Sequence, residues 1–109
     1  MANEFKNAQN VGVTSVATVY TAPAGKTSIL LELDLANTTS NVVEASVQIF
    51  DTSASTSAYI VKNAPVPAGG SLMVIAGQKI VLEPTDIVKV TATGAVDVVA
   101  AILEDVNPA

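Results

Sequence analysis

Two features of the sequence predict an all-β fold, an antiparallel β-sandwich that is jelly-roll-like and has about eight short strands. Apolar and polar residues alternate with a period of two in several segments, and no segment sustains the period of about 3.6 residues that marks an amphipathic helix. Turn residues separate these segments at intervals of about 8–12 residues, which is typical of sandwiches and barrels. One core is expected, because 109 residues is the size of a single domain.

The clearest alternation lies between residues 29 and 35. One face of this expected strand carries the apolar side chains of Ile29, Leu31, Leu33 and Leu35. The other face carries Glu32 and Asp34, so the strand is expected to be half-buried. Residues 43–49 repeat the pattern, and the polar segment 37–41 between the two runs predicts that they form an antiparallel pair.

The remaining strands are expected between clear turn signals. Pro-Ala-Gly occurs at residues 23–25 and again at 67–69, placed as in a type I turn, and Pro84 takes the same turn position. Gly77-Gln78 and Thr93-Gly94 are expected to close hairpins. The expected strands are residues 11–20, 57–62, 72–76, 79–82, 87–93 and 95–103.

Three parts of the chain are expected from this reading. Residues 1–10 are polar and unpatterned, which predicts a flexible N-terminal arm. Residues 11–105 form the sandwich domain, and residues 106–109 form a C-terminal tail. No apolar run approaches the roughly 18 residues of a membrane span and no signal peptide is visible, so we expect synthesis in a cytoplasm.

Composition excludes several classes of function. The chain has no Cys, no His and no Arg, and its net charge is −5. Disulfides, thiolate and imidazole metal sites and the usual nucleophile-base pairs are therefore unavailable. An acidic chain without Arg is also poorly suited to bind nucleic acid or an anionic membrane, so neither is an expected partner.

The remaining groups suited to chemistry are carboxylates, at Glu32/Asp34, Glu83/Asp86 and Glu104/Asp105. We interpret the first pair as the solvated face of a strand, and we expect Asp86 to cap backbone amides in a turn. A cation or substrate at the first pair, or calcium at the second, is the alternative. We therefore predict that the chain is not an enzyme and has no catalytic residue, no metal ligand and no cofactor.

Other residues also receive structural interpretations. Asn37 begins a glycosylation acceptor pattern that we interpret as a polar turn. Tyr20 and Tyr59 are expected to pack against a sheet with their hydroxyls in water. Three lysines are expected to protect strand edges from aggregation. These lysines are Lys62, Lys79 and Lys89.

Two expected strands, residues 72–76 and 95–103, are apolar on both faces. A sandwich strand buries one face in the core, so the second face must be covered by a loop, by the N-terminal arm or by a neighbouring subunit. We favour the subunit, because so short a chain has little spare material. The candidate interface residues are Leu72, Met73, Ile75, Val99, Ala101 and Leu103.

Between residues 13 and 104 the chain resembles small structural proteins of tailed bacteriophages. The resemblance lies in residues 19–26 leading into a strand that ends at 35–39, in residues 66–72 and 78–84, and in the closing segment 96–104. Such proteins commonly have Gly before the Asp of the third turn, where this sequence has Thr85.

The resemblance implies a short sandwich or jelly-roll subunit of the virion, made in the host cytoplasm. The expected function is a capsid decoration or cement protein. It would form a homo-oligomer such as a trimer and would bind the major capsid protein over capsomer junctions, stabilising the head. A protein of the tail, neck or fibre is the structural alternative, and a carbohydrate-binding module is the alternative of another class.

Overall fold

The computed structural model describes residues 4–104, with the backbone alone for residues 77 and 78. Eight strands make up this part of the chain, and no helix in it is long and apolar enough to cross a membrane. The strands are β1 (Glu4–Val13), β2 (Ala17–Thr21), β3 (Ser28–Asn37), β4 (Val43–Asp51), β5 (Thr56–Val66), β6 (Ser71–Leu82), β7 (Ile87–Ala92) and β8 (Val96–Glu104).

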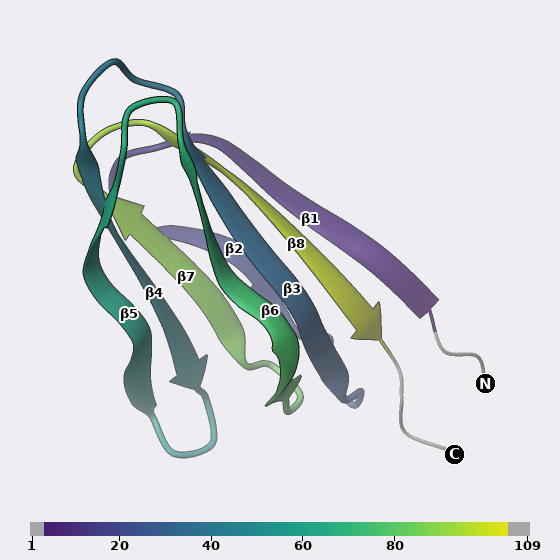
Figure 1. The fold of residues 1–109 in the computed structure, drawn as a ribbon. Helices are drawn as coiled ribbons and strands as arrows, with labels where there is room; N and C mark the ends of the chain where they lie inside the picture. Colours follow the sequence, from purple (N-terminus) through teal and green to yellow (C-terminus); the bar gives the residue numbers. More distant parts are fainter. Residues whose placement is uncertain (1–3, 105–109) are drawn as a thin grey trace.

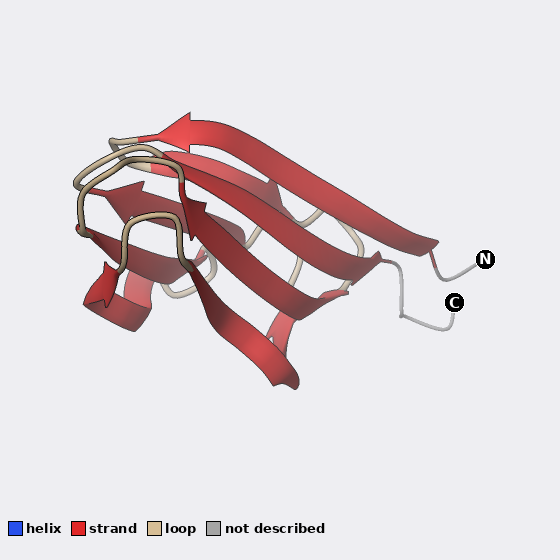
Figure 2. Cartoon of the chain, turned by 45° about the horizontal axis from the view of Figure 1, so that its top comes forward, coloured by secondary structure: helices blue, strands red, loops and turns tan. Residues whose placement is uncertain are grey.

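The strands form two four-stranded sheets with the orders β1-β8-β3-β6 and β2-β7-β4-β5, and all their pairings are antiparallel (Figures 1 and 2). Only β4 and β5 are neighbours both in the chain and in a sheet; every other connection crosses from one sheet to the other. This is the topology of a jelly roll. The predicted all-β sandwich is therefore confirmed.

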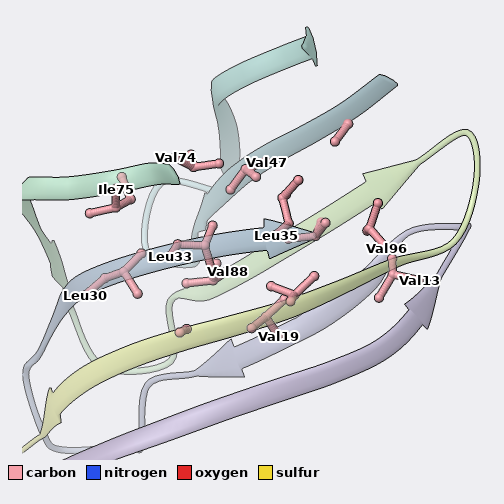
Figure 3. Close-up of a cluster of buried hydrophobic side chains, with 14 of the residues drawn as sticks. Val13, Val19, Leu30, Leu33, Leu35, Val47, Val74, Ile75, Val88 and Val96 are labelled. Atoms are coloured by element: carbon pink, nitrogen blue, oxygen red, sulfur yellow. The ribbon is translucent and has the colours of Figure 1, made fainter. Parts of the chain in front are cut away.

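Apolar side chains from both sheets meet between them and form a single core (Figure 3). Most are small or β-branched, as the sequence suggests, and aromatic rings are absent from the buried apolar set. The largest fully buried side chains are Leu30, Leu33, Leu35, Ile75, Leu82, Ile102, Val47, Val66, Val88, Val90, Val96 and Val98.

The prediction that β3 and β4 pair was wrong, because the segment between them crosses from one sheet to the other. Asn37 holds this crossing to the one between β5 and β6. Its backbone N–H donates to the carbonyl of Gly70 at 2.8 Å, and its side-chain amide donates to the carbonyls of Asn41 and Val66. Both crossings lie at one end of the sandwich (Figure 1). Asn37 is buried, so its apparent glycosylation motif is a structural turn.

The two expected short hairpins were also wrong. Gly77 and Gln78 lie within the single strand β6, which joins the two segments that the sequence analysis separated. Thr93 and Gly94 lie between β7 and β8, which belong to different sheets. A single Gly in the sequence does not show whether the chain forms a hairpin, a bulge or a crossing between sheets. Gly is compatible with the backbone conformations of all three.

A β-bulge at Leu31 reverses the faces expected for the first half of β3. Leu30 pairs with Ile102 on β8 and Glu32 pairs with Ala101, so Leu31 is the extra residue. Before the bulge Leu30 points into the core, and Ile29, which was expected there, points outward. A bulge shifts the alternation by one residue, which moves every side chain on one side of it to the other face.

The first strand was not expected. Residues 4–10, predicted as part of a flexible arm, form the first part of β1, which pairs with β8 from Glu4 opposite Glu104 to Asn10 opposite Val98. The expected strand at residues 11–20 is correspondingly divided between the end of β1 and β2. Backbone hydrogen bonds to a strand that is already buried can order a polar segment that has little apolar pattern of its own. The predicted tail at residues 106–109 lies outside the described residues.

Candidate interaction surface

The outer face of sheet β1-β8-β3-β6 is the most apolar exposed surface of the described chain, and we call it the apolar face. Residues paired across antiparallel strands point to the same side of a sheet, so the register gives its composition. The apolar face consists of Phe5, Asn7 and Gln9 on β1, Val99, Ala101 and Leu103 on β8, Ile29, Glu32 and Asp34 on β3, and Met73, Ala76 and Val81 on β6.

One apolar row crosses all four strands of this face. Phe5 pairs with Leu103, which pairs in turn with Ile29. Ile29 pairs on its other side with Val81. Phe5 and Val81, at the two ends of the row, are 76% and 60% exposed. Contiguous apolar surface of this kind marks interaction sites on soluble proteins.

Glu32 and Asp34 interrupt the apolar face near its centre. Asp34 lies between Val99 on β8 and Met73 on β6. Burial, followed by the neighbouring Glu32 carboxyl, raises the pKa of Asp34 above its ordinary value. Asp34 Oδ1 is shielded from water and accepts no hydrogen bond from any described residue. Neither carboxylate has a cation within ion-pair distance in that part of the chain, so the pair is poorly stabilised within the subunit itself.

The structure divides the six predicted interface residues into two groups. Those on the apolar face are Met73, Val99, Ala101 and Leu103. The assignment was wrong for Leu72, which packs against the core, and for Ile75, which is fully buried within it. A bulge at Val74 reverses the alternation, so Ile75 does not share a face with Met73. Contact of the other four residues with a partner stays a prediction.

Three residues of the apolar row were missed. Phe5 was assigned to the arm and Ile29 to the core. Val81 was placed in a strand, but the side of the sheet to which it points was not predicted. Phe5 carried the only usable signal, because a large aromatic side chain stands out in an otherwise polar segment. The facing of Ile29 depends on a bulge that has no marker in the sequence.

The outer face of the other sheet carries the opposite charge near its middle. Lys89 Nζ lies 5.1 Å from the centroid of the Phe50 ring, and Lys62 Nζ lies 5.2 Å from that of Tyr59. We call the surface of these four residues the lysine face. Lys62 and Lys79 lie on the edge strands β5 and β6, as expected, but the prediction was wrong for Lys89, because β7 is an inner strand.

A polar cluster at the margin of the core joins the two sheets. The Tyr20 hydroxyl on β2 donates to Glu104 Oε2 on β8 and lies 3.0 Å from the Ser28 hydroxyl on β3. Lys6 Nζ approaches Glu104 Oε1 at 3.2 Å. The expectation that the Tyr20 hydroxyl is hydrated was wrong. Burial and the hydrogen bond with Glu104 raise the pKa of Tyr20 to about 12, so it remains a hydrogen-bond donor.

Asp51, Glu83 and Asp86 form a carboxylate cluster whose nearest oxygens lie within 4.8 Å of one another. Asp86 is buried, and its two oxygens accept hydrogen bonds from the backbone N–H groups of Thr52 and Glu83. Asp86 therefore caps backbone amides, as predicted. Asp51 accepts from the backbone and side chain of Ser53. These hydrogen bonds give the cluster a structural role, because they stabilise the two turns and join one to the other.

No pocket opens in the surface of residues 4–104. The candidate interaction surface is thus a broad sheet face and not a cleft. The predicted absence of catalytic residues, metal ligands and cofactors stays a prediction.

Comparison with known proteins gives a likeness of fold. No family model and no curated protein matches the chain. Among solved structures, the T13 particle of infectious bursal disease virus aligns over 94% of this chain with 11% identity and a TM-score of 0.49. The Gt strain of that virus aligns with 10% identity and a TM-score of 0.41. A mutant VP2 protein of infectious bursal disease virus, in derived T=1 particles, aligns with 12% identity and a TM-score of 0.36.

This chain covers 35%, 36% and 39% of the three matched viral chains. At this identity and these TM-scores, the likeness defines no function. What the chain does must be inferred from its own surfaces.

Proposed function

We propose that this chain is a structural protein of a virus particle, a capsid decoration or cement protein. It associates with copies of itself, as a trimer or another oligomer, and binds the major capsid protein over junctions between capsomers. The observation that carries this proposal is the apolar face, with its row from Phe5 to Val81. The resemblance of the turns and strands to phage structural proteins supports the same role.

The chemistry of the chain is consistent with a binding role. Without His or Cys, reactions would depend on carboxylates, Lys or hydroxyls. Of the carboxylates, Asp86, Asp51 and Glu104 already accept hydrogen bonds from neighbouring groups in the fold. We propose that the chain has no enzymatic activity.

Stabilisation of the shell would follow from mass action. A subunit that binds the assembled shell and not its separated capsomers shifts the equilibrium towards assembly by RT ln(1 + [L]/Kd). At a free concentration of about 100 times Kd this amounts to about 2.7 kcal/mol per site. Many such sites on one shell would raise the temperature at which it opens.

The test is addition of the purified chain to shells that lack it. We expect binding in a fixed ratio to capsomers and survival of the shell at a higher temperature. Met73→Lys places a charge on the apolar face, through which copies associate, and should reduce the amount of chain bound per shell, whereas Val42→Lys is the matched control, since Met73 and Val42 are 66% and 64% exposed. Equal heat resistance of shells with and without bound chain would refute the cement role.

The alternatives give different results in the same preparation. A tail, neck or fibre protein would be found by immunogold labelling at the tail and not on the shell. A carbohydrate-binding module would ignore the particle and bind a defined glycan on an array.

A further inference from the structure

We propose that the apolar face of one subunit packs against the lysine face of a second copy of the same chain. This inference rests on the proposed function, in that it names the surface through which the subunits of the particle associate with one another. It is carried by two properties of the chain. The outer faces of its two sheets have complementary charge, and the whole sheet face that contains the apolar face has the size of a protein interface.

The acidic side of the contact is Glu32 and Asp34. Both point outward from β3, an inner strand, so they lie within the sheet face and not at its edge. In the described part of the chain, the one ion pair joins Lys6 to Glu104, elsewhere in the fold. Lys79 on β6 is exposed and forms no ion pair with either carboxylate. A carboxylate partly buried among apolar side chains needs a cation, and a partner could supply it.

The cationic side is Lys62 and Lys89 with their rings. Lys89 pairs with Gln48, which pairs in turn with Tyr59, so the lysine face lies across the middle of its own sheet. Each ammonium lies over an aromatic ring within the range of a cation-π interaction, 5.1 and 5.2 Å from the centroids. The exposed Tyr59 ring offers apolar contact area beside the charge. Apolar surface with two cations complements apolar surface with two carboxylates.

The same charges disfavour the symmetric arrangement. Two copies joined apolar face to apolar face would bring Glu32 and Asp34 of one copy against the same residues of the other. Like charges brought together in a desolvated interface are repulsive and weaken association. Packing the apolar face on the lysine face replaces this repulsion with attraction.

The area is sufficient for a specific contact. Four strands spaced by about 4.8 Å, with a usable length of about 30 Å, give the whole outer face of this sheet an area of roughly 600 Å². Specific protein interfaces bury about 600–1,000 Å² on each partner. The whole outer face of the sheet, of which the apolar face is a part, is therefore at the lower end of this range, and loops at either end of the sandwich would add to it.

The predicted contact is heterologous, because it joins two different faces. The two faces lie on opposite sides of the sandwich, so each bound copy leaves one face of each kind free. Such contacts repeat from copy to copy and build a series or a ring, not a closed twofold dimer.

The experiment uses two charge-reversed full-length chains in sedimentation velocity. The first carries Glu32→Lys with Asp34→Asn, which makes the apolar face cationic. The second carries Lys62→Glu with Lys89→Glu, which makes the lysine face anionic. Each variant alone brings like charges together and should associate at least about tenfold more weakly than the parent chain. An equimolar mixture joins opposite charges again and should recover the association of the parent.

Matched controls carry the same kinds of charge change away from both faces. Glu83→Lys and Lys26→Glu lie in exposed turns and should associate like the parent. Circular dichroism of each variant verifies that it is folded. Equal association of all variants, or no recovery in the mixture, would overturn the inference.

Shell binding distinguishes failure of this inference from failure of the proposed function. A parent chain that adds to shells but stays monomeric at all concentrations would refute the contact and leave the cement role standing. A chain that forms the predicted series but ignores shells would refute the cement role and leave the contact standing.

Discussion

The Tyr20 hydroxyl donates a 2.5 Å hydrogen bond to Glu104 Oε2 and so links the two sheets of the sandwich at the margin of the core. Tyr20 lies on β2 and Glu104 lies on β8, far apart in the chain. The carboxylate is buried, and Lys6 is its other charged partner. A hydrogen bond to an ionised acceptor is among the stronger polar contacts in proteins.

Tyr20→Phe should lower the free energy of unfolding by about 1.5–3 kcal/mol, because it removes a hydrogen bond to a charged acceptor and leaves that acceptor less well satisfied. Urea titration followed by circular dichroism measures the change. Tyr59→Phe is the matched control, since Tyr59 is 52% exposed and its hydroxyl makes no hydrogen bond to a described residue. Equal losses in the two variants would contradict the role assigned to Tyr20.

Acid should unfold the chain partly through Glu104. The hydrogen bond from Tyr20, and then Lys6, hold the pKa of Glu104 below its ordinary value of 4.5. For an acid with a lowered folded pKa, the stabilisation is fully present above 4.5 and is lost as the pH falls through the folded pKa. Glu104→Gln should therefore be less stable than the parent at pH 7 and should lose less stability below about pH 4. Parallel stability profiles over that range would argue against this linkage.

The contribution of Asp34 to folding stability should change with pH in the opposite direction to that of Glu104. Its pKa is raised, first by burial and then by Glu32, so between the ordinary and the raised value the folded state binds more protons than the unfolded state. Stability from this group consequently falls as the pH rises through that window. Asp34→Asn should be more stable than the parent at pH 7, and the gain should shrink as the pH falls through the same window and be lost below the ordinary value of 3.8, where Asp34 is protonated in both states. A gain that is constant with pH would show that charge is not its cause.

Thr85 occupies a backbone conformation that suits Gly. Its φ is 69°, in the left-handed region, which costs a β-branched residue roughly 1–2 kcal/mol. Thr85→Gly should raise the free energy of unfolding by about 0.5–1 kcal/mol after the greater freedom of Gly in the unfolded chain is subtracted. Asn63→Gly is the control, because Asn63 has a similar φ of 54° but tolerates it well. A loss of stability in Thr85→Gly, measured by thermal denaturation, would rule out strain at this turn.

The Thr85 conformation also explains the departure noted in the sequence. Related turns were expected to have Gly before the Asp, and the structure shows that the third turn here keeps the left-handed geometry without it. The Thr85 N–H donates to the carbonyl of Ala22 at 3.0 Å, and its own carbonyl accepts from the Thr52 hydroxyl at 2.7 Å. These two contacts and the Asp86 cap hold the turn against its local preference.

The sequence by itself determined the class of fold and much of the core. The period of two in residues 43–49, together with the two Pro-Ala-Gly turns, predicted strands that the structure contains. It also placed Val99 and Met73 on a candidate surface, because both lie in segments with more apolar residues than one core face requires.

Only the tertiary structure decided which strands are neighbours and which side chains face outward. The partner of β3 is not the next strand in the chain, because the buried Asn37 and its hydrogen bonds stabilise a crossing that local sequence does not specify. The bulges at Leu31 and Val74 exchange inward and outward residues, which removed Ile75 from the predicted surface and added Ile29. Alternation is a local property, whereas bulges and strand order follow from the fit of two sheets around one core.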